Sequence, residues 1–235
     1  VIAAPSSGAG KTMIVAGLLA ALRARGVDVR AAKSGPDYID GAFHAAASGL
    51  ECVNLDAWAM APAQLRALAA GQGGELLVVE GAMGLFDGAP DLAAPMGRGS
   101  VAELAGVLDL PVVLVIDASR AAQTAAVVAK GLADALGGRA DASGGDIYEK
   151  KIVGVVLNRV GSARHEAMLR ASFAAQGLAV LGSVPRDEAM ERESRHLGLV
   201  QAGEDVGLAV TLGQMAALLA RHVDLDALLG LAKPV

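Results

Sequence analysis

The stretch APSSGAGKT, residues 4–12, limits most strongly what this chain can fold into. The short apolar run VIAA (1–4) leads into it, and a long segment rich in alanine and leucine follows it. Backbone N–H groups of a glycine-rich turn that enters a helix can surround phosphate oxygens, and the helix dipole adds to the attraction. A strand, this turn and a helix in succession therefore predict a phosphate-binding loop of the P-loop type.

Each part of this loop has an expected role. Lys11 is expected to reach the β- and γ-phosphates of ATP, and the Thr12 hydroxyl to bind Mg²⁺. The residues expected to contact the phosphates through the loop are Ser7, Gly8, Ala9 and Gly10. The full pattern G-x-x-x-x-G-K-[ST] requires glycine at position 5, where Pro5 stands. A plain glycine-rich turn is the alternative, but the flanking strand and helix favour nucleotide binding.

The rest of the chain alternates apolar, β-branched runs with alanine-rich stretches, which predicts strands alternating with helices. The predicted strands are 1–4, 27–33, 75–81, 111–117, 151–158 and 179–185. The predicted helices are 10–25, 100–109, 121–136, 162–176 and 207–229. Several strands are apolar without alternation, as in sheets covered on both faces. This order predicts an α/β fold with a doubly wound, mostly parallel sheet, whose ligands lie at the carboxyl ends of the strands.

Charged side chains follow the second predicted strand. Lys33 ends it, and Asp37 and Asp40 come directly afterwards in KSGPDYID (33–40). A lysine there can neutralise a phosphate or a substrate carboxylate, and Asp37 can hold Mg²⁺. The alternative is an aspartate-rich turn that caps the next helix. We expect Lys33 and Asp40 to be catalytic.

Two more acids lie at and beyond the end of the third predicted strand, in VVEGAMGLFDG (78–88). Glu80 stands where a P-loop protein needs a Mg²⁺-binding carboxylate. Asp87 comes seven positions later between glycines, in a loop that can fold back over the site, and we expect it to be catalytic. The alternatives are an exposed strand end for Glu80 and an ordinary turn residue for Asp87.

Other strand ends carry polar residues of less definite role. Asp117 is expected to cap the helix that follows it. Asn158 is expected to read the adenine edge of the nucleotide, with a turn asparagine as the alternative. Cys52, the only cysteine, is expected in the core, and His44 and His165 are expected to be surface or packing residues.

Composition excludes several classes of function. The net charge is −5, aromatic residues make up 3%, and no block of lysine and arginine occurs. These features argue against a nucleic-acid-binding surface. No apolar run reaches the roughly 18 residues of a membrane span. With a single cysteine, the expectation is a cytoplasmic protein without disulfides.

Seven motifs in one order resemble a known family. They are APSSGAGKT, KSGPDYID..FH, CVNLDAW, EGAMGLFDG, GS.AELA..L.LPVVLVID, GVVLNRVGSARHE and RHLGLV. Together they resemble the N-terminal synthetase domain of cobyrinate or hydrogenobyrinate a,c-diamide synthases, which is similar in fold to dethiobiotin synthetase. The resemblance extends over nearly the whole chain, so residues 1–235 are expected to form one synthetase domain.

The resemblance implies a reaction. The family phosphorylates the c and a acetate carboxylates of a corrin ring with ATP and Mg²⁺, and then replaces the phosphate with ammonia from glutamine. It implies nucleotide and Mg²⁺ positions for Lys11, Thr12 and Glu80. Tyr38, Arg195 and His196 are placed at the corrinoid substrate. By analogy with dethiobiotin synthetase, a homodimer is expected.

Two segments depart from the family's pattern. The glutamine-hydrolysing domain of the family is absent from this chain, which we therefore expect to be part of a longer polypeptide. The polar, glycine-rich residues 137–151 have no clear counterpart, and a surface excursion is expected there. Two other functions stay open: a partition- or switch-type ATPase, although Ser6 and Ser7 replace the early lysine of many such proteins, and a dethiobiotin-synthetase-like ligase of small acids.

Overall fold

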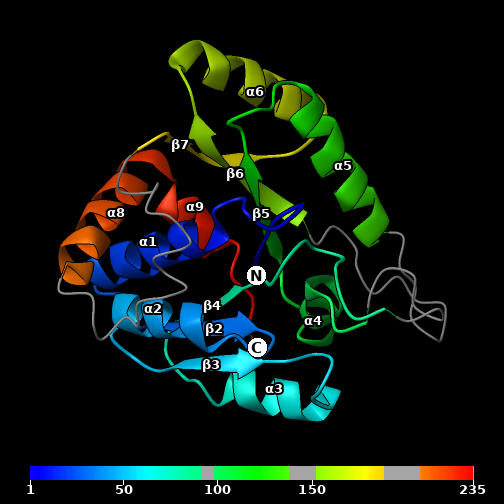
Figure 1. The fold of residues 1–235 in the computed structure, drawn as a ribbon, viewed down its shortest axis with the longest axis vertical. Coiled ribbons are helices and arrows are strands. Elements are labelled where there is room, and N and C mark those ends of the chain that lie inside the picture. Colours follow the sequence, from blue (N-terminus) through cyan, green and yellow to red (C-terminus); the bar gives the residue numbers. More distant parts are fainter. Residues whose placement is uncertain (91–97, 138–151, 188–206, 235) are drawn as a thin grey trace.

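The computed structural model describes residues 1–90, 98–137, 152–187 and 207–234, and its architecture is a single sheet between two layers of helices (Figure 1). The sheet has seven strands in the order β3-β2-β4-β1-β5-β6-β7, and every pair of neighbouring strands is parallel. The strands are β1 (Ile2–Ala3), β2 (Val29–Ser34), β3 (Cys52–Leu55), β4 (Leu76–Glu80), β5 (Val112–Asp117), β6 (Ile152–Val160) and β7 (Val180–Pro185). This is the doubly wound α/β sheet that the sequence predicts.

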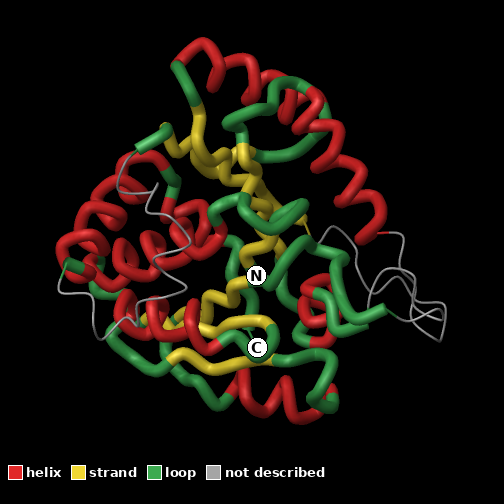
Figure 2. Tube along the Cα trace, viewed as in Figure 1, coloured by secondary structure: helices red, strands yellow, loops and turns green. Residues whose placement is uncertain are grey.

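Helices fill the connections between the strands, and α8 and α9 follow the last strand (Figure 2). They are α1 (Lys11–Ala24), α2 (Tyr38–Ser48), α3 (Pro62–Ala70), α4 (Val101–Val107), α5 (Thr124–Gly137), α6 (Ala163–Ala175), α8 (Leu208–His222) and α9 (Leu225–Gly230). Side chains from α1, α2, α8 and α9 form one core cluster with the sheet. Side chains from α3 to α6 form two clusters on the other face. None of the helices in these described segments is long and apolar enough to cross a membrane.

The alternation of side chains along the strands divides the core. In β5, Val113 and Val115 belong to the cluster of α1 and α8, whereas Val112, Leu114 and Ile116 belong to the cluster of α5 and α6. All five are buried. A strand that is buried on both faces has no polar face, which explains why this run is continuously apolar in the sequence.

Three parts of the fold differ from the sequence-based prediction. Helices α2 and α3 match none of the predicted helix ranges. Strand β3 was not predicted, since it is short and contains Asn54; it forms because Lys33 and its neighbours in β2 pair with it. The single helix predicted over 207–229 is wrong. It ends at His222, because Val223 is extended and bridges Gly182, and the Asp224 side chain then caps α9.

The topology decides where a ligand can bind. From the central strand β1 the chain builds β2, β3 and β4 on one side of it, and then β5, β6 and β7 on the other. At such a switch point the loops after neighbouring strands diverge and leave a crevice at their carboxyl ends. The P-loop follows β1 and therefore lies at this crevice.

We expect Leu219→Ala to destabilise the protein by roughly 2–5 kcal/mol, because the removed atoms leave a cavity between α8 and α1. Leu219 is fully buried and lies beside Gly17 of α1. Val210→Ala, on the same helix but 67% exposed, is the matched control and should change stability by about 0.5 kcal/mol or less. Urea unfolding measures both, and equal effects would contradict this account of the core.

Candidate nucleotide-binding site

The P-loop connects β1 to α1 in the conformation that its glycines allow. Gly8 and Gly10 have φ angles of +79° and +88°, which side chains of L-residues disfavour. A Cβ atom on Gly10 would also lie 2.3 Å from Nδ2 of Asn158. Glycine at this position therefore lets the loop pass close to β6.

Asn158 and Arg159, near the end of β6, hold the P-loop through hydrogen bonds to its carbonyl groups. Asn158 Nδ2 donates to the carbonyl of Ala9 at 2.9 Å, and the Asn158 side chain is buried. Arg159, with φ +57°, donates from Nη1 to the carbonyl of Gly8 at 2.9 Å and to Asp117 Oδ2 at 2.7 Å. The Asn158 amide thus contacts the P-loop itself, and recognition of adenine by Asn158 stays a prediction.

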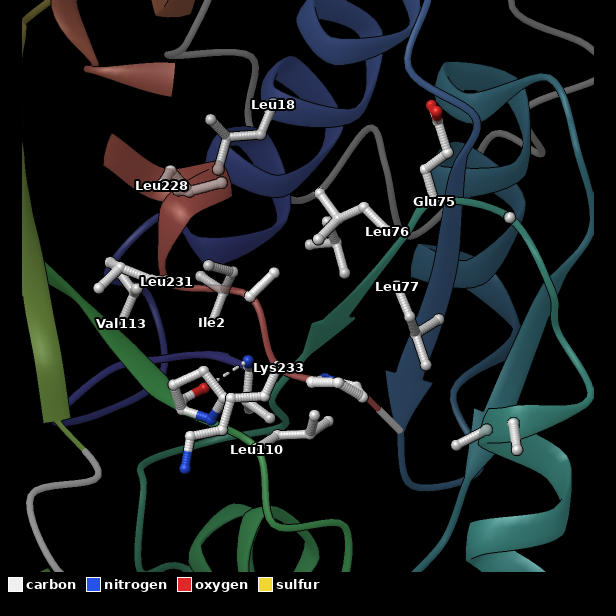
Figure 3. A pocket seen from close by; sticks show the side chains of 18 of the residues that line it. Ile2, Leu18, Glu75, Leu76, Leu77, Leu110, Val113, Leu228, Leu231 and Lys233 are labelled. Atoms are coloured by element: carbon white, nitrogen blue, oxygen red, sulfur yellow. Dashed lines mark hydrogen bonds between the residues drawn. The ribbon is translucent and has the colours of Figure 1, made fainter. Parts of the chain in front are cut away.

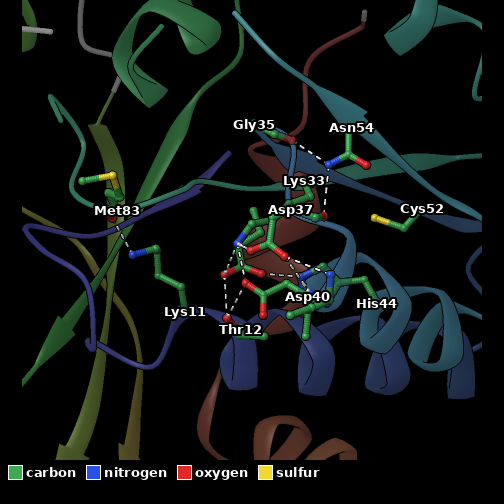
Figure 4. Close-up of polar contacts among 12 residues, drawn as sticks. Lys11, Thr12, Lys33, Gly35, Asp37, Asp40, His44, Cys52, Asn54 and Met83 are labelled. Atoms are coloured by element: carbon green, nitrogen blue, oxygen red, sulfur yellow. Dashed lines mark hydrogen bonds and ion pairs between the residues drawn. The ribbon is translucent and has the colours of Figure 1, made fainter. Parts of the chain in front are cut away.

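Lys11 lies at the start of α1 and is buried under the loop that follows β4. Its Nζ donates to the carbonyl of Met83 at 2.6 Å and to that of Ser6 at 3.3 Å, and Figure 4 shows it directed toward Met83. Burial lowers the pKa of Lys11, although Glu80 opposes the shift. The backbone carbonyls therefore hold the lysine ammonium group beside the P-loop.

The loop after β4 packs directly on the P-loop. Leu85 N–H donates to the carbonyl of Ala4 at 2.8 Å. A Cβ atom on Gly84 would lie 2.6 Å from the carbonyl oxygen of Pro5, so only glycine allows this approach. Asp87 accepts a hydrogen bond from Gly84 N–H at 2.8 Å and is exposed. Asp87 therefore stabilises this loop, and its predicted catalytic role stays a prediction.

A cluster of charges lies beside the P-loop, around the ammonium group of Lys33 (Figure 4). Lys33 Nζ is 2.5 Å from Asp40 Oδ2, 3.2 Å from Glu80 Oε1 and 3.5 Å from Asp37 Oδ2. Thr12 Oγ1 donates to Glu80 Oε1 at 2.8 Å and lies 3.3 Å from Asp40 Oδ2. The structure thus brings together residues from β2, α2, β4 and α1 that the sequence places far apart. We call Thr12, Lys33, Asp37, Asp40 and Glu80 the Lys33 cluster.

Burial and charge pairing compete in this cluster. Burial alone lowers the pKa of Lys33, but Glu80, Asp40 and Asp37 outweigh it and raise the pKa above its ordinary value. Burial and the nearby Glu80 raise the pKa of Asp40, and Lys33 offsets only part of that shift. Lys33 is therefore held charged, while Asp40 is the more basic of the two aspartates.

Glu80 is almost completely buried and fully paired. Burial alone raises its pKa, but the contacts with His44, Lys33 and Thr12 together bring the pKa below its ordinary value. The His44 Nε2 atom contacts Glu80 Oε2, and His44 is fully buried. The expectation that His44 is a surface or packing residue is therefore incomplete. The missed signal is the spacing of Asp37, Asp40 and His44 at i, i+3 and i+7, which places them on one face of a helix.

Helix α2 begins within this cluster. The Asp37 side chain caps it by accepting hydrogen bonds from the N–H groups of Ile39 and Asp40 at 3.0 and 3.1 Å. These backbone bonds and Lys33 lower the pKa of Asp37 against the opposing effect of burial. Its predicted role as a metal ligand stays a prediction beside this capping role. Tyr38 is 76% exposed at the start of α2 and so is free to contact a ligand.

The remaining predicted residues take no part in the cluster as described. Arg195 and His196 lie outside the described residues, as does nearly all of the 137–151 segment. Cys52 is half-buried in β3, where burial and the nearby Glu80 raise the pKa of its thiol to about 12. Such a thiol is a poor nucleophile. His165 contacts the carbonyl of Ala121 through Nε2 at 2.8 Å.

An apolar cavity of about 270 Å³ lies at the opposite edge of the sheet (Figure 3). Its walls include Ile2, Leu76 and Val113, which stand where β1, β4 and β5 begin, together with Leu228 and Leu231. The Lys33 cluster and the P-loop are at the carboxyl ends of the strands. This cavity is therefore separate from the site.

The doubly wound parallel sheet, the P-loop after β1 and the acid at the end of β4 define a P-loop nucleotide-binding domain of the α/β class. Comparison with known families agrees. Residues 1–200 match the model of the family described as "CbiA: CobQ/CobB/MinD/ParA nucleotide binding domain", and the chain belongs to this family.

Similar curated proteins are named hydrogenobyrinate a,c-diamide synthase. The protein from Brucella suis biovar 1 (strain 1330) is 50% identical over 232 residues, which are 97% of this chain and 49% of that protein. The protein from Rhodobacter capsulatus is 50% identical over 98% of this chain and 51% of its own length. The protein from Mesorhizobium japonicum is 48% identical over 100% of this chain and 51% of its own length. The chain thus spans about half the length of these relatives.

The pairing of Asp117 with Arg159 predicts a pH-dependent contribution to stability. Burial alone raises the pKa of Asp117, but the Ser119 N–H and the Arg159 guanidinium outweigh it and lower the pKa. The carboxylate therefore stabilises the fold above the unfolded-state pKa of about 3.9. This contribution is lost as the pH falls through the folded-state pKa. Asp117→Asn should destabilise the protein by about 1 kcal/mol at pH 7.

Thermal unfolding at several pH values measures this effect. The difference between wild type and Asp117→Asn should shrink as the pH falls toward 3. Asp134→Asn is the control, because Asp134 pairs with Lys130 on the surface, where its side chain is 64% exposed. Surface pairs of this kind contribute little. If the stability difference between wild type and Asp117→Asn stays constant as the pH falls toward 3, the ionised Asp117 carboxylate does not stabilise the fold in the way described.

Proposed function

We propose that residues 1–235 are the synthetase domain of a cobyrinate or hydrogenobyrinate a,c-diamide synthase. In this proposal the domain amidates the a and c acetate carboxylates of the corrinoid through acyl-phosphate intermediates. The observation that carries it is the Lys33 cluster beside a P-loop, in a chain about 50% identical to proteins with that name. Glutamine hydrolysis is assigned to a portion of the protein outside this chain, since the relatives are about twice as long.

The donor atoms of the site suit a nucleotide-bound magnesium ion. Among the described residues no three His, Cys, Asp or Glu side chains surround a metal position by themselves. A P-loop site does not need such a set, because phosphates and water supply the other ligands. Thr12 and Glu80 provide the hydroxyl and carboxylate, with Asp37 as a further candidate. When bound, Mg²⁺ would neutralise charge on the phosphates of ATP.

The first step needs charge neutralisation more than a protein nucleophile. A carboxylate oxygen of the substrate attacks the γ-phosphorus of ATP, the bond to the ADP oxygen breaks, and an acyl phosphate forms. Lys11, once it leaves the Met83 carbonyl, can reach the phosphates, and Lys33 can hold the substrate carboxylate or the transferred group. Both ammonium groups lie beside the P-loop in the structure, which supports these roles.

The second step needs a base. Ammonia attacks the acyl carbon, phosphate leaves, and a proton must depart from the nitrogen. Asp40 is the first candidate to orient ammonia and accept this proton, because burial and Glu80 raise its pKa. Asp87 is the second candidate. Tyr38 and, from the segment outside the described residues, Arg195 and His196 are proposed to contact the corrinoid.

ADP formation by the 235-residue chain tests the proposal. We expect release of ADP that requires Mg²⁺, a corrinoid carboxylate and ammonium, but that glutamine does not support. With substrate labelled by ¹⁸O in its carboxylates, the label should appear in the released phosphate, because the acyl phosphate transfers that oxygen. Hydroxylamine in place of ammonium should give a hydroxamate.

Other outcomes would favour the alternatives. ADP formation that DNA or a protein partner stimulates, without any corrinoid, would point to a switch-type ATPase. ADP formation with a small diamino acid would point to a dethiobiotin-synthetase-like ligase. Sedimentation would test the expected homodimer, on which the chemistry proposed here does not depend.

Asp40→Asn should reduce kcat for amidation by roughly 10²- to 10⁴-fold, the usual effect of losing a general base. The affinity for ATP with Mg²⁺ should stay close to that of wild type. Asp134→Asn on the surface of α5 is the control and should leave kcat unchanged. Steady-state kinetics and calorimetry measure these values. A normal kcat in a folded Asp40→Asn protein would move the role of base to Asp87, to be tested with Asp87→Asn.

A further inference from the structure

Among the described residues, His44 contacts Glu80 in the site's hydrogen-bond network, but neither the sequence motifs nor the proposed reaction gives it a role there. It lies on the inner face of α2, and its side chain has no exposed surface. Its Nε2 atom contacts Glu80 Oε2, and its ring lies among the other side chains of the network in Figure 4. Within the described part of the chain, the Nδ1 atom has no hydrogen-bond partner.

The Glu80 carboxylate is held from both sides. Its Oε1 atom accepts a hydrogen bond from Thr12 at 2.8 Å and lies 3.2 Å from Lys33 Nζ, whereas His44 contacts Oε2. An ionised carboxylate only accepts hydrogen bonds, so the His44 ring donates through Nε2–H. The terminal torsion of a glutamate is soft, and without His44 the carboxylate would be held at Oε1 alone, by Thr12 and Lys33, with Oε2 left unpartnered.

The position of His44 carries a cost in stability. The imidazole reaches Glu80 from α2 and is fully buried, with Nδ1 unpartnered among the described residues. A buried imidazole with an unpartnered ring nitrogen is unfavourable for stability. A purely apolar residue would fill the space without that cost, which indicates that the contact with Glu80 is the reason for a histidine here.

We propose that His44 is a positioning residue, which holds Glu80 so that Oε1 faces the Thr12 hydroxyl and the place of the nucleotide-bound magnesium ion. The inference rests on the proposed function only in that Glu80 is taken as a magnesium ligand. It requires no contact between His44 and the nucleotide, the metal or the corrinoid. Hydrogen-bond partners of metal ligands typically affect metal affinity by roughly 10- to 100-fold.

Calorimetry with magnesium and a non-hydrolysable ATP analogue tests the inference without any turnover. For His44→Phe, which fills the space but cannot donate, the Mg²⁺ concentration needed for half-maximal nucleotide binding should rise by roughly tenfold or more. His44→Gln keeps an N–H donor and should restore most of the affinity. A histidine that only packs would instead show the larger loss with glutamine and little with phenylalanine.

A double-mutant cycle links the effect to Glu80. Glu80→Gln should raise the Mg²⁺ requirement by itself, and His44→Phe should add little to it in that background, because residues in one network are not additive. Full additivity would overturn the inference. Urea unfolding of the metal-free variants checks that each one folds; if His44→Phe does not, His44→Asn, whose amide is too short to reach Glu80, replaces it.

The outcomes separate this inference from the proposed function. If wild type binds no nucleotide in the presence of Mg²⁺, the proposed function fails and the His44 inference fails with it. If wild type binds but folded His44→Phe has the same Mg²⁺ requirement, only the His44 inference fails. A raised Mg²⁺ requirement in His44→Phe, with a requirement near that of wild type in His44→Gln, supports the His44 inference.

Discussion

The ammonium group of Lys33, buried among three carboxylates, is the interaction on which the site depends. Placing Glu80 and Asp40 beside each other in a water-poor region would be strongly unfavourable without a cation between them. Lys33 supplies that charge from the neighbouring strand, at 3.2 Å from Glu80 and 2.5 Å from Asp40. It stands directly opposite Glu80 in the register of β2 and β4, so backbone pairing fixes the geometry.

The P-loop is supported by contacts on both of its sides. Asn158 and Arg159, on β6, hold its carbonyl groups, and Asp117 at the end of β5 orients the Arg159 guanidinium. The loop after β4 covers the opposite side through the contacts of Leu85 and Gly84. Because these contacts come from the ends of β4, β5 and β6, the shape of the loop depends on the packing of several strands.

Sequence reasoning predicted the class of fold and named all five members of the Lys33 cluster as site residues, but it missed the contact of His44 with Glu80. Long apolar strands are recognisable because they are buried on both faces, and the position of Glu80 after such a strand indicates the carboxyl edge. Strand β3 was missed because it has only four residues and Asn54 interrupts its apolar run, and it pairs with β2 alone. Arg159 was missed since nothing local sets a surface arginine apart from one that bridges two loops.

The sequence by itself determined the alternation of strands and helices, the P-loop and the acids at the strand ends, because these depend on hydrophobic period, glycine and chain order. Only the tertiary structure decided which of those polar groups meet. The pairing of β2 with β4 placed Lys33 against Glu80, and the approach of α2 buried His44 behind that carboxylate. Contacts between residues dozens of positions apart depend on strand register and helix packing, which no local pattern records.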